Sequence, residues 1–264
     1  MKNKFKLNSS TLLVFILTTG VFGIINTEMG VIGILPLIAE NFQVTVPEAG
    51  WTVSIFALVV AISAPITPLL FSGINRKKVM ILALGLFTLS NVISMMTTNF
   101  TVLLISRALP AFLHPVYVSM AFTVAAASVS KEKAPKAVAK VFIGVSAGMV
   151  LGVPVTSYIA SEVSYSMGML FFTVVNALVL VATILFVPSM PVKEKLSYGT
   201  QLSVLKKKVV WYSILAITLI NGALFGFFSY MSDYLKTITG VSYTVISTML
   251  LIYGLANIIG NVIA

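Results

Sequence analysis

The chain has 264 residues, of which 58% are hydrophobic and 9% are charged. With a mean hydropathy of +1.05, this composition excludes a soluble globular domain and predicts an all-α integral membrane protein. The formal net charge of +10 does not indicate nucleic-acid binding, because the basic residues lie in short clusters between apolar runs. Cysteine is absent and histidine occurs once, so we expect no disulfide, no metal site and no cofactor.

Eight apolar runs predict eight membrane-spanning helices, since a helix needs about 20 residues to cross the hydrocarbon core. The runs cover residues 11–38, 50–71, 79–97, 101–129, 138–160, 167–187, 209–232 and 243–264. We predict an N-terminal six-helix bundle at 1–187, a cytoplasmic linker at 188–208, and the first two helices of a second bundle at 209–264. The last run has no basic flank, so we expect either a fragment of a longer transporter or a truncated gene product.

The basic clusters predict the orientation of the chain in the membrane. Clusters at the N-terminus and at 76–78, 131–140 and 193–208 all fall on one side of the predicted membrane, and Lys236 is the exception. Cytoplasmic loops of membrane proteins carry the excess of lysine and arginine. We therefore predict a plasma-membrane protein with a cytoplasmic N-terminus.

The fourth run contains the stretch LLISRALPAFLHPVY, with an arginine inside the membrane. A guanidinium at the centre of a membrane helix costs about 2.5 to 3.5 kcal/mol, so Arg107 is predicted to be functional and to have a partner within the bundle. His114 follows almost two turns later on nearly the same face. Pro110 and Pro115 predict a bent helix. The alternatives are that Arg107 extends to the headgroups and that His114 donates to a freed carbonyl.

Glu28 lies deep in the first run, in the sequence GIINTEMGVIGILP. At 1.5 Å per residue, Glu28 lies about 15 Å from the outer surface, between Arg107 at about 9 Å and His114 at about 20 Å. A buried carboxylate resists ionisation unless a cation is close. We predict that Glu28 exchanges a proton while Arg107 and His114 bias its charge. A static ion pair between two helices is the alternative.

Other polar residues within the runs predict a substrate cavity near the bilayer midplane. We assign Asn26, Tyr117 and Asn221 to its wall, on the first, fourth and seventh helices. Asn91 and Asn176 lie in two further runs. Each of them either faces the substrate path or forms a hydrogen bond across helices.

Glycine recurs at every fourth position of the fifth run, at Gly144, Gly148 and Gly152, and Pro154 follows. Small residues at this spacing allow two helix backbones to approach closely. We predict that this face is a helix contact surface and expect the eighth helix to lie on it in a complete protein.

Four stretches together resemble a known family: TEMGVIGILPLIAENFQV, AGWTVSIFALVVAISAP, SRALPAFLHPVY and GVSAGMVLGVPV. The chain resembles the major facilitator superfamily, specifically the bacterial twelve-helix drug:proton antiporters that include sugar-efflux and nucleoside-efflux permeases. The resemblance implies that Arg107 is the arginine of the family's fourth-helix motif, linked to proton transfer. It also implies that the segment from Gly144 to Pro154 matches the antiporter motif. His114 and Glu28 look like the histidine and the first-helix acid of this subgroup.

The loop after the second run, LLFSGINRKKV, departs from the family pattern. The superfamily usually has an acidic residue and an arginine ahead of a glycine there. In this chain Ser72, Gly73 and Asn75 occupy these places, and only Arg76 and Lys77 fit the pattern. We therefore do not expect this loop to form the family's ion pair that latches one conformation.

The resemblance implies proton-coupled efflux of a small organic molecule, by alternating access between two helical halves. A sugar, a nucleoside and an amphiphilic drug all fit the polar residues available. The implied partners are the substrate, protons and the lipid bilayer, and we expect a monomer. An intramembrane enzyme is not expected, since one acid and one histidine lack metal-site or nucleophile spacing. The alternative is a truncated membrane fragment that does not transport.

Overall fold

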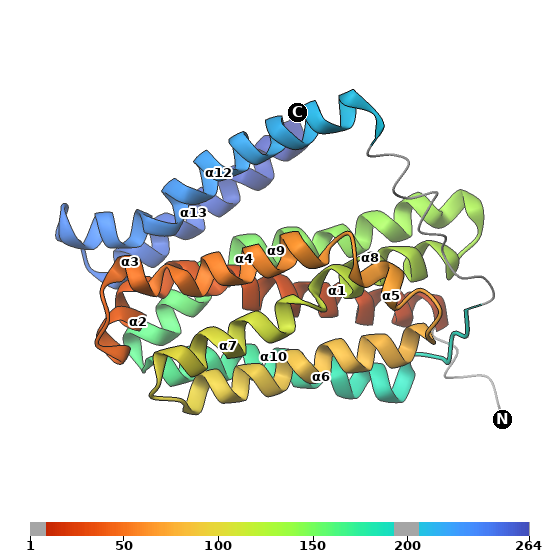
Figure 1. The fold of residues 1–264 in the computed structure, drawn as a ribbon, viewed down its shortest axis with the longest axis horizontal. Coiled ribbons are helices and arrows are strands. Elements are labelled where there is room, and N and C mark those ends of the chain that lie inside the picture. The colour runs from red at the N-terminus through yellow and green to blue at the C-terminus, as the bar shows by residue number, and fades with distance from the viewer. Residues whose placement is uncertain (1–8, 193–205, 264) are drawn as a thin grey trace.

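The structure is a computed structural model that describes residues 9–192 and 206–263, and the elements in these residues are helices (Figure 1). The elements are α1 (Ser9–Met29), η1 (Gly30–Ile34), α2 (Leu35–Phe42), α3 (Val46–Ala49), α4 (Trp51–Ser63), α5 (Thr67–Leu70), α6 (Arg76–Met96), α7 (Phe100–Ala111), α8 (His114–Ala127), η2 (Lys131–Lys133), α9 (Ala134–Glu162), α10 (Tyr165–Phe186), α12 (Lys208–Thr237) and α13 (Tyr243–Ile263). Within the described residues, seven helical stretches are long and apolar enough to cross a membrane. They match the first seven predicted runs, and α13 occupies the eighth. The predicted all-α membrane fold is confirmed.

Three of the predicted spans are broken where the sequence removes or weakens helical hydrogen bonds. The first span passes from α1 through the 3-10 turn η1 into α2, which has Pro36 in its first turn. The second breaks between α4 and α5, around Pro65. The fourth breaks between α7 and α8, where Pro110 lies in the last turn of α7 and Pro115 in the first turn of α8. Proline is tolerated in a first turn because its missing N–H has no partner there. The fourth predicted span is therefore interrupted at the place where its two prolines predict a bend.

Helix α1 runs through the middle of the first six spans and packs against α8, α9 and α10. Its side chains Leu17, Val21 and Ile24 are buried in the largest apolar cluster, which also includes Phe87 of α6 and Val116 of α8. Helices α6 and α10 lie side by side along one edge of this bundle (Figure 1). The residues around Glu28 are therefore enclosed by several helices.

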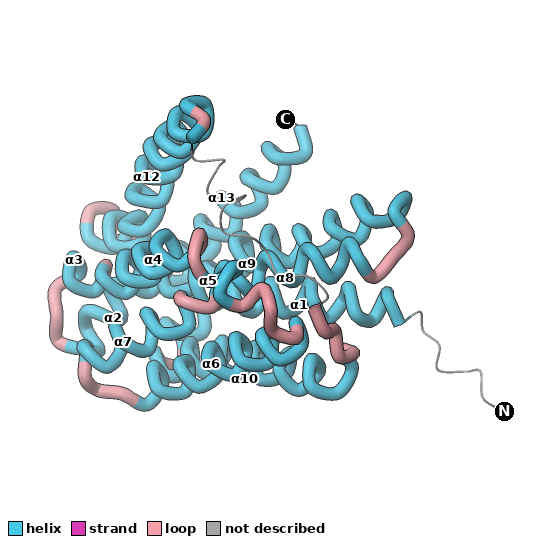
Figure 2. Tube along the Cα trace, turned by 45° about the vertical axis from the view of Figure 1, so that its right-hand side comes forward, coloured by secondary structure: helices cyan, strands magenta, loops and turns pink. Residues whose placement is uncertain are grey.

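Helices α12 and α13 form a hairpin on one side of the bundle, where α13 contacts α9 (Figures 1 and 2). Pro154 lies inside α9 and has no N–H, so it cannot donate to the main-chain oxygen of Val150 one turn earlier. This oxygen faces Gly254 of α13. A β-carbon added to Gly254 would lie 3.1 Å from it. Thr244 donates to the Glu162 carboxylate at 2.9 Å, at the other end of the contact. The hairpin is thus seated on α9, and the division of the chain into two bundles stays a prediction.

The loop that departs from the family pattern binds the segment after α10. The Asn75 side chain caps α6, donates to the Ser189 hydroxyl at 2.8 Å and accepts from the Met190 N–H at 3.3 Å. The Arg76 N–H donates to the Met190 oxygen at 3.1 Å, and the Lys77 Nζ donates to a main-chain oxygen of α10 at 2.8 Å. The first residues of the predicted linker are therefore docked on the bundle. Residues 193–205 of that linker lie outside the described residues.

Candidate functional site

Arg107 points from α7 into the bundle and is 3% exposed. Its three side-chain nitrogens donate to main-chain oxygens: Nη1 to Thr27 at 2.7 Å, Nη2 to Glu28 at 3.2 Å, and Nε to Thr52 at 3.3 Å. The guanidinium carbon also lies 4.9 Å from the centre of the Phe56 ring. The predicted partner inside the bundle exists, but it consists of backbone oxygens and an aromatic face.

The positions of these oxygens explain why an arginine is tolerated here. Helix α1 ends at Met29, so the carbonyls of Thr27 and Glu28 belong to its last turn, where the regular pattern of α-helical hydrogen bonds stops. The end of a helix carries partial negative charge, which favours a cation. The break in the first span thus creates the site that Arg107 fills.

The carboxylate of Glu28 pairs with His114, at 3.1 Å between Oε2 and Nε2. The two side chains are 18% and 12% exposed. His114 begins α8 at the break between α7 and α8, and its ring packs edge-on against Phe56, with 5.9 Å between ring centres. The sequence correctly brings Glu28, Arg107 and His114 to one site, but the side chain that faces the carboxylate is His114.

The glycine face of α9 lies against α1. A β-carbon added to Gly148 would come within 2.8 Å of the Ile25 β-carbon, and one added to Gly152 would come within 2.8 Å of the Asn26 Oδ1. A β-carbon added to Gly144 would overlap the Thr18 main-chain oxygen of α1. The prediction of a helix contact surface is confirmed, and in this chain the helix that these glycines meet is α1 rather than the eighth helix expected in a complete protein. Helix α13 contacts a neighbouring face of α9 instead, because the spacing of small residues does not specify which helix they meet.

The three residues assigned to the substrate wall lie apart from one another. Asn26 is fully buried between α1 and α9, and Tyr117 is buried in α8 with its hydroxyl against Gly20. Asn221 is exposed on α12 and donates to the Ile217 oxygen of its own helix at 2.9 Å. The structure does not bring them together around one cavity.

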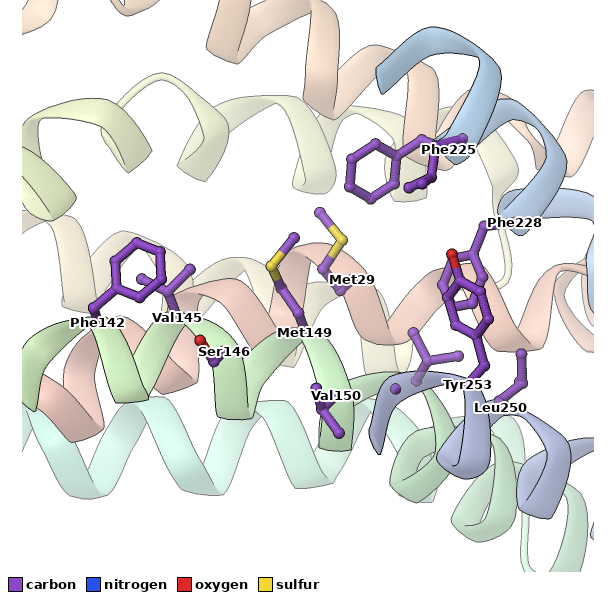
Figure 3. A pocket seen from close by; sticks show the side chains of 13 residues that line it. Met29, Phe142, Val145, Ser146, Met149, Val150, Phe225, Phe228, Leu250 and Tyr253 are labelled. Atoms are coloured by element: carbon purple, nitrogen blue, oxygen red, sulfur yellow. The ribbon is translucent and has the colours of Figure 1, made fainter. Parts of the chain in front are cut away.

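A cavity of about 170 Å³ does occur between the bundle and the α12–α13 hairpin (Figure 3). In Figure 3 Met29 and Met149 lie near the centre of the view, with Phe142 to their left and Phe228 and Tyr253 to their right. Phe228 and Tyr253 stack on each other with 4.9 Å between ring centres. The wall is formed by Met29, Phe142, Val145, Ser146, Met149, Val150, Val153, Leu224, Phe225, Phe228, Leu250, Tyr253 and Gly254. It is therefore mainly apolar and rich in aromatic and sulfur-containing side chains.

Comparison with known proteins decides the family. The sequence pattern of the Major Facilitator Superfamily matches residues 12–264. The chain belongs to this superfamily. It is thus a multi-pass membrane protein of a transporter family, and the prediction that it is not an enzyme is confirmed.

Individual members of the superfamily resemble the chain along most of its length. It is 31% identical over 245 residues to the inner membrane transport protein YdhP of Escherichia coli, covering 93% of this chain and 63% of that protein. It is 32% identical over 253 residues to the uncharacterized transporter YtbD of Bacillus subtilis, covering 94% of this chain and 63% of the relative. The chain therefore spans somewhat less than two thirds of the length of these relatives.

Solved structures of other transporters share the fold. The nucleoside transporter NupG, solved as a mutant, matches with a TM-score of 0.74 and 14% identity, over 95% of this chain and 65% of that one. A bacterial homologue of the human lysosomal transporter Spinster, in an inward-facing conformation, matches with a TM-score of 0.72 and 17% identity, over 94% and 59%. At these identities the likeness concerns the fold alone.

Two features of the site were missed from the sequence. Phe56, which touches both Arg107 and His114, is one of 17 phenylalanines, and an aromatic residue in an apolar run gives no sign of its neighbours. The carbonyls of Thr27 and Thr52 are main-chain atoms, so no residue type reveals them. The glycines and the proline between Gly30 and Pro36 were the available signal, because a broken helix exposes carbonyls.

Proposed function

We propose that this superfamily member is a proton-coupled exporter in which Glu28 carries the exchanged proton. The observation that supports this most strongly is the Glu28–His114 pair, 3.1 Å apart and partly exposed inside the bundle. Carboxylate and imidazole side chains are the groups that form proton relays inside membrane proteins. The bond network of Arg107 leaves this carboxylate free to face the histidine.

Arg107 acts in this proposal on the backbone that carries the acid. Its hydrogen bonds to the Thr27 and Glu28 oxygens hold the end of α1, and its bond to the Thr52 oxygen ties that end to α4. The guanidinium also places a fixed positive charge near Glu28. Lysine cannot replace it, because an ammonium lacks the planar array of five donors.

The substrate site in this proposal is the cavity next to Met29. Its apolar wall favours an uncharged, largely apolar molecule over a sugar, since buried sugar hydroxyls without partners are costly. Methionine and aromatic side chains adapt to ligands of different shape. Among the three substrate classes suggested by the resemblance, the cavity therefore favours an amphiphilic drug-like compound.

Neighbouring residues of α1 connect the two parts of the mechanism. Glu28 faces His114 on α8, while Met29 borders the cavity between α9 and the α12–α13 hairpin. A ligand that moves the end of α1 changes the distance between Glu28 and His114, and protonation of Glu28 weakens the same pair. Substrate and proton thus compete through one short segment, as exchange by alternating access requires. We further propose a cytoplasmic N-terminus, a monomer, and a location in the bacterial cell membrane.

The proposal is tested in vesicles that contain the purified chain, with an uncharged lipophilic fluorescent dye as the transported probe and an imposed pH gradient. Glu28→Gln should abolish gradient-driven transport while probe binding remains. Glu40→Gln, at an exposed acid near the end of α2, is the matched control and should transport normally.

Unchanged gradient-driven transport in Glu28→Gln would overturn the assignment of the proton site. If the unmodified chain moves no probe in vesicles where it is folded, the exporter proposal fails for this chain and the non-transporting fragment is favoured.

A further inference from the structure

Two asparagine side chains, from α6 and α10, donate to the hydroxyl of Thr27, the residue before Glu28. Thr27 is fully buried, and its hydroxyl donates to the Gly23 oxygen one turn earlier in α1, at 2.9 Å. The same hydroxyl oxygen accepts from Asn176 Nδ2 of α10 at 2.9 Å and from Asn91 Nδ2 of α6 at 3.3 Å. A hydroxyl has one proton and two lone pairs, so the hydrogen-bonding capacity of Thr27 is fully used.

The two asparagines are themselves buried, at 0% exposure for Asn176 and 3% for Asn91. Asn176 is anchored to its own helix, because Nδ2 also donates to the Phe172 oxygen at 2.9 Å. A third and longer contact of this nitrogen reaches the Gly23 oxygen at 3.3 Å. Asn176 thus connects the backbone of α10 to both the backbone and the side chain of α1.

These hydrogen bonds hold α1 close to the point where its regular pattern of α-helical hydrogen bonds ends. The helix ends at Met29 and continues as a 3-10 turn. Successive residues of a helix are rotated by about 100° about its axis. Fixing the Thr27 side chain toward α6 and α10 therefore fixes the direction in which the Glu28 side chain leaves α1.

We infer that Thr27, Asn91 and Asn176 are positioning residues, which hold Glu28 at the rotation and depth that place its carboxylate against His114. Within the described residues, no hydrogen bond joins any of the three to the carboxylate, and none of them lines the cavity. The titratable groups that face Glu28 are His114 from α8 and Arg107 from α7. The inference rests on the proposed function only in regarding Glu28 as the proton site.

A direct measurement of the Glu28–His114 contact is available because the chain has a single histidine. The chain, purified without a histidine tag and grown with isotope-labelled histidine, gives one set of imidazole nitrogen signals by NMR at a fixed pH. Glu28→Gln should move these signals, since it removes the charge opposite the ring. This variant sets the size of the full effect.

Thr27→Val keeps the shape of the side chain and removes its hydroxyl. It should move the His114 signals in the same direction as Glu28→Gln and by a smaller amount, and Thr27→Ser should restore them. Asn176→Leu should also move them. Thr173→Val, one turn away on α10, removes a hydroxyl that bonds only within its own helix and should have no effect.

Unchanged His114 signals in folded Thr27→Val and Asn176→Leu, with a clear change in Glu28→Gln, would overturn the inference. If Thr27→Val does not fold, Asn91→Leu tests the same point, because it removes only the longer bond to Thr27. Failure of the proposed function looks different: Glu28→Gln then leaves gradient-driven transport unchanged, while the NMR signals still report whether the three residues position Glu28.

Discussion

Two faces of α1 are held in the bundle by different means. On one face, Thr27 and the neighbouring carbonyls receive hydrogen bonds from Asn91 of α6, Arg107 of α7 and Asn176 of α10. The opposite face packs on α9 mainly through glycines, together with a hydrogen bond from the Thr18 hydroxyl to the Lys140 main-chain oxygen at 3.2 Å. Hydrogen bonds are directional and set the rotation and depth of a helix, whereas close packing mainly sets the distance between two helices.

The packed face changes character at the end of α1. Before the break, the glycines belong to α9 and the larger side chains to α1. After it, Gly30 and Gly33 of η1 face the hydroxyls of Thr156 and Ser157 on α9. Within the described residues, these hydroxyls and the Asn26 amide have no hydrogen-bond partner. The α9 face is therefore close-packed even where its side chains are polar.

Of the predicted substitutions, those at Arg107 on the hydrogen-bonded face of α1 should reduce the unfolding free energy most. Arg107→Leu leaves the Thr27, Glu28 and Thr52 oxygens without their guanidinium donors, and an unsatisfied buried group costs about 1 to 3 kcal/mol. We expect a loss of about 3 kcal/mol or more of unfolding free energy, measured by denaturation in detergent. The unfolding free energy of Arg107→Lys should lie between those of Arg107→Leu and the unmodified chain. Arg76→Leu is the control, because the contact of Arg76 with Met190 uses its main-chain nitrogen. Equal stability of Arg107→Leu and the unmodified chain would contradict the role of the guanidinium.

An intermediate effect is expected on the packed face. Gly148→Leu inserts a branched side chain where a β-carbon alone would lie 2.8 Å from that of Ile25. Overpacking of this kind typically costs about 1 to 3 kcal/mol. Gly85→Leu on α6 is the matched control, since a β-carbon there meets nothing within 4 Å. The same denaturation experiment should separate the two variants, and a Gly148→Leu protein as stable as Gly85→Leu would show that α1 and α9 are farther apart.

The smallest effect is expected for a threonine on the packed face. Replacing a buried threonine by valine on each face makes the same chemical change in both places, so the two losses of stability can be compared directly. Thr156→Val removes a buried hydroxyl without a described partner and should change the unfolding free energy by less than about 0.5 kcal/mol. Thr27→Val removes a hydroxyl with three partners and should cost about 1 to 3 kcal/mol. Equal losses in the two variants would mean that the faces are held alike.

The sequence reveals the charged residues of the site because burying a charge in a membrane is costly. Glu28, Arg107 and His114 were found because ionisable residues are rare in membrane helices and need partners. The sequence did not predict which of these side chains contact each other, because an estimate of depth in the membrane does not tell in which direction a side chain leaves its helix. Asn75 was seen only as a departure from the family pattern, and its bonds to Ser189 and Met190 depend on a segment more than 100 residues away in the chain.

The hydrogen bonds of Arg107 also bear on how this protein varies during evolution. The guanidinium contacts oxygens that every amino acid possesses, so positions 27, 28 and 52 can change residue type without losing the bond itself. Coordinated substitution between position 107 and these three is therefore not expected, although they are in direct contact. Methods that infer neighbours from correlated changes in related sequences should find Asn91 and Asn176 next to Thr27, and should overlook the arginine.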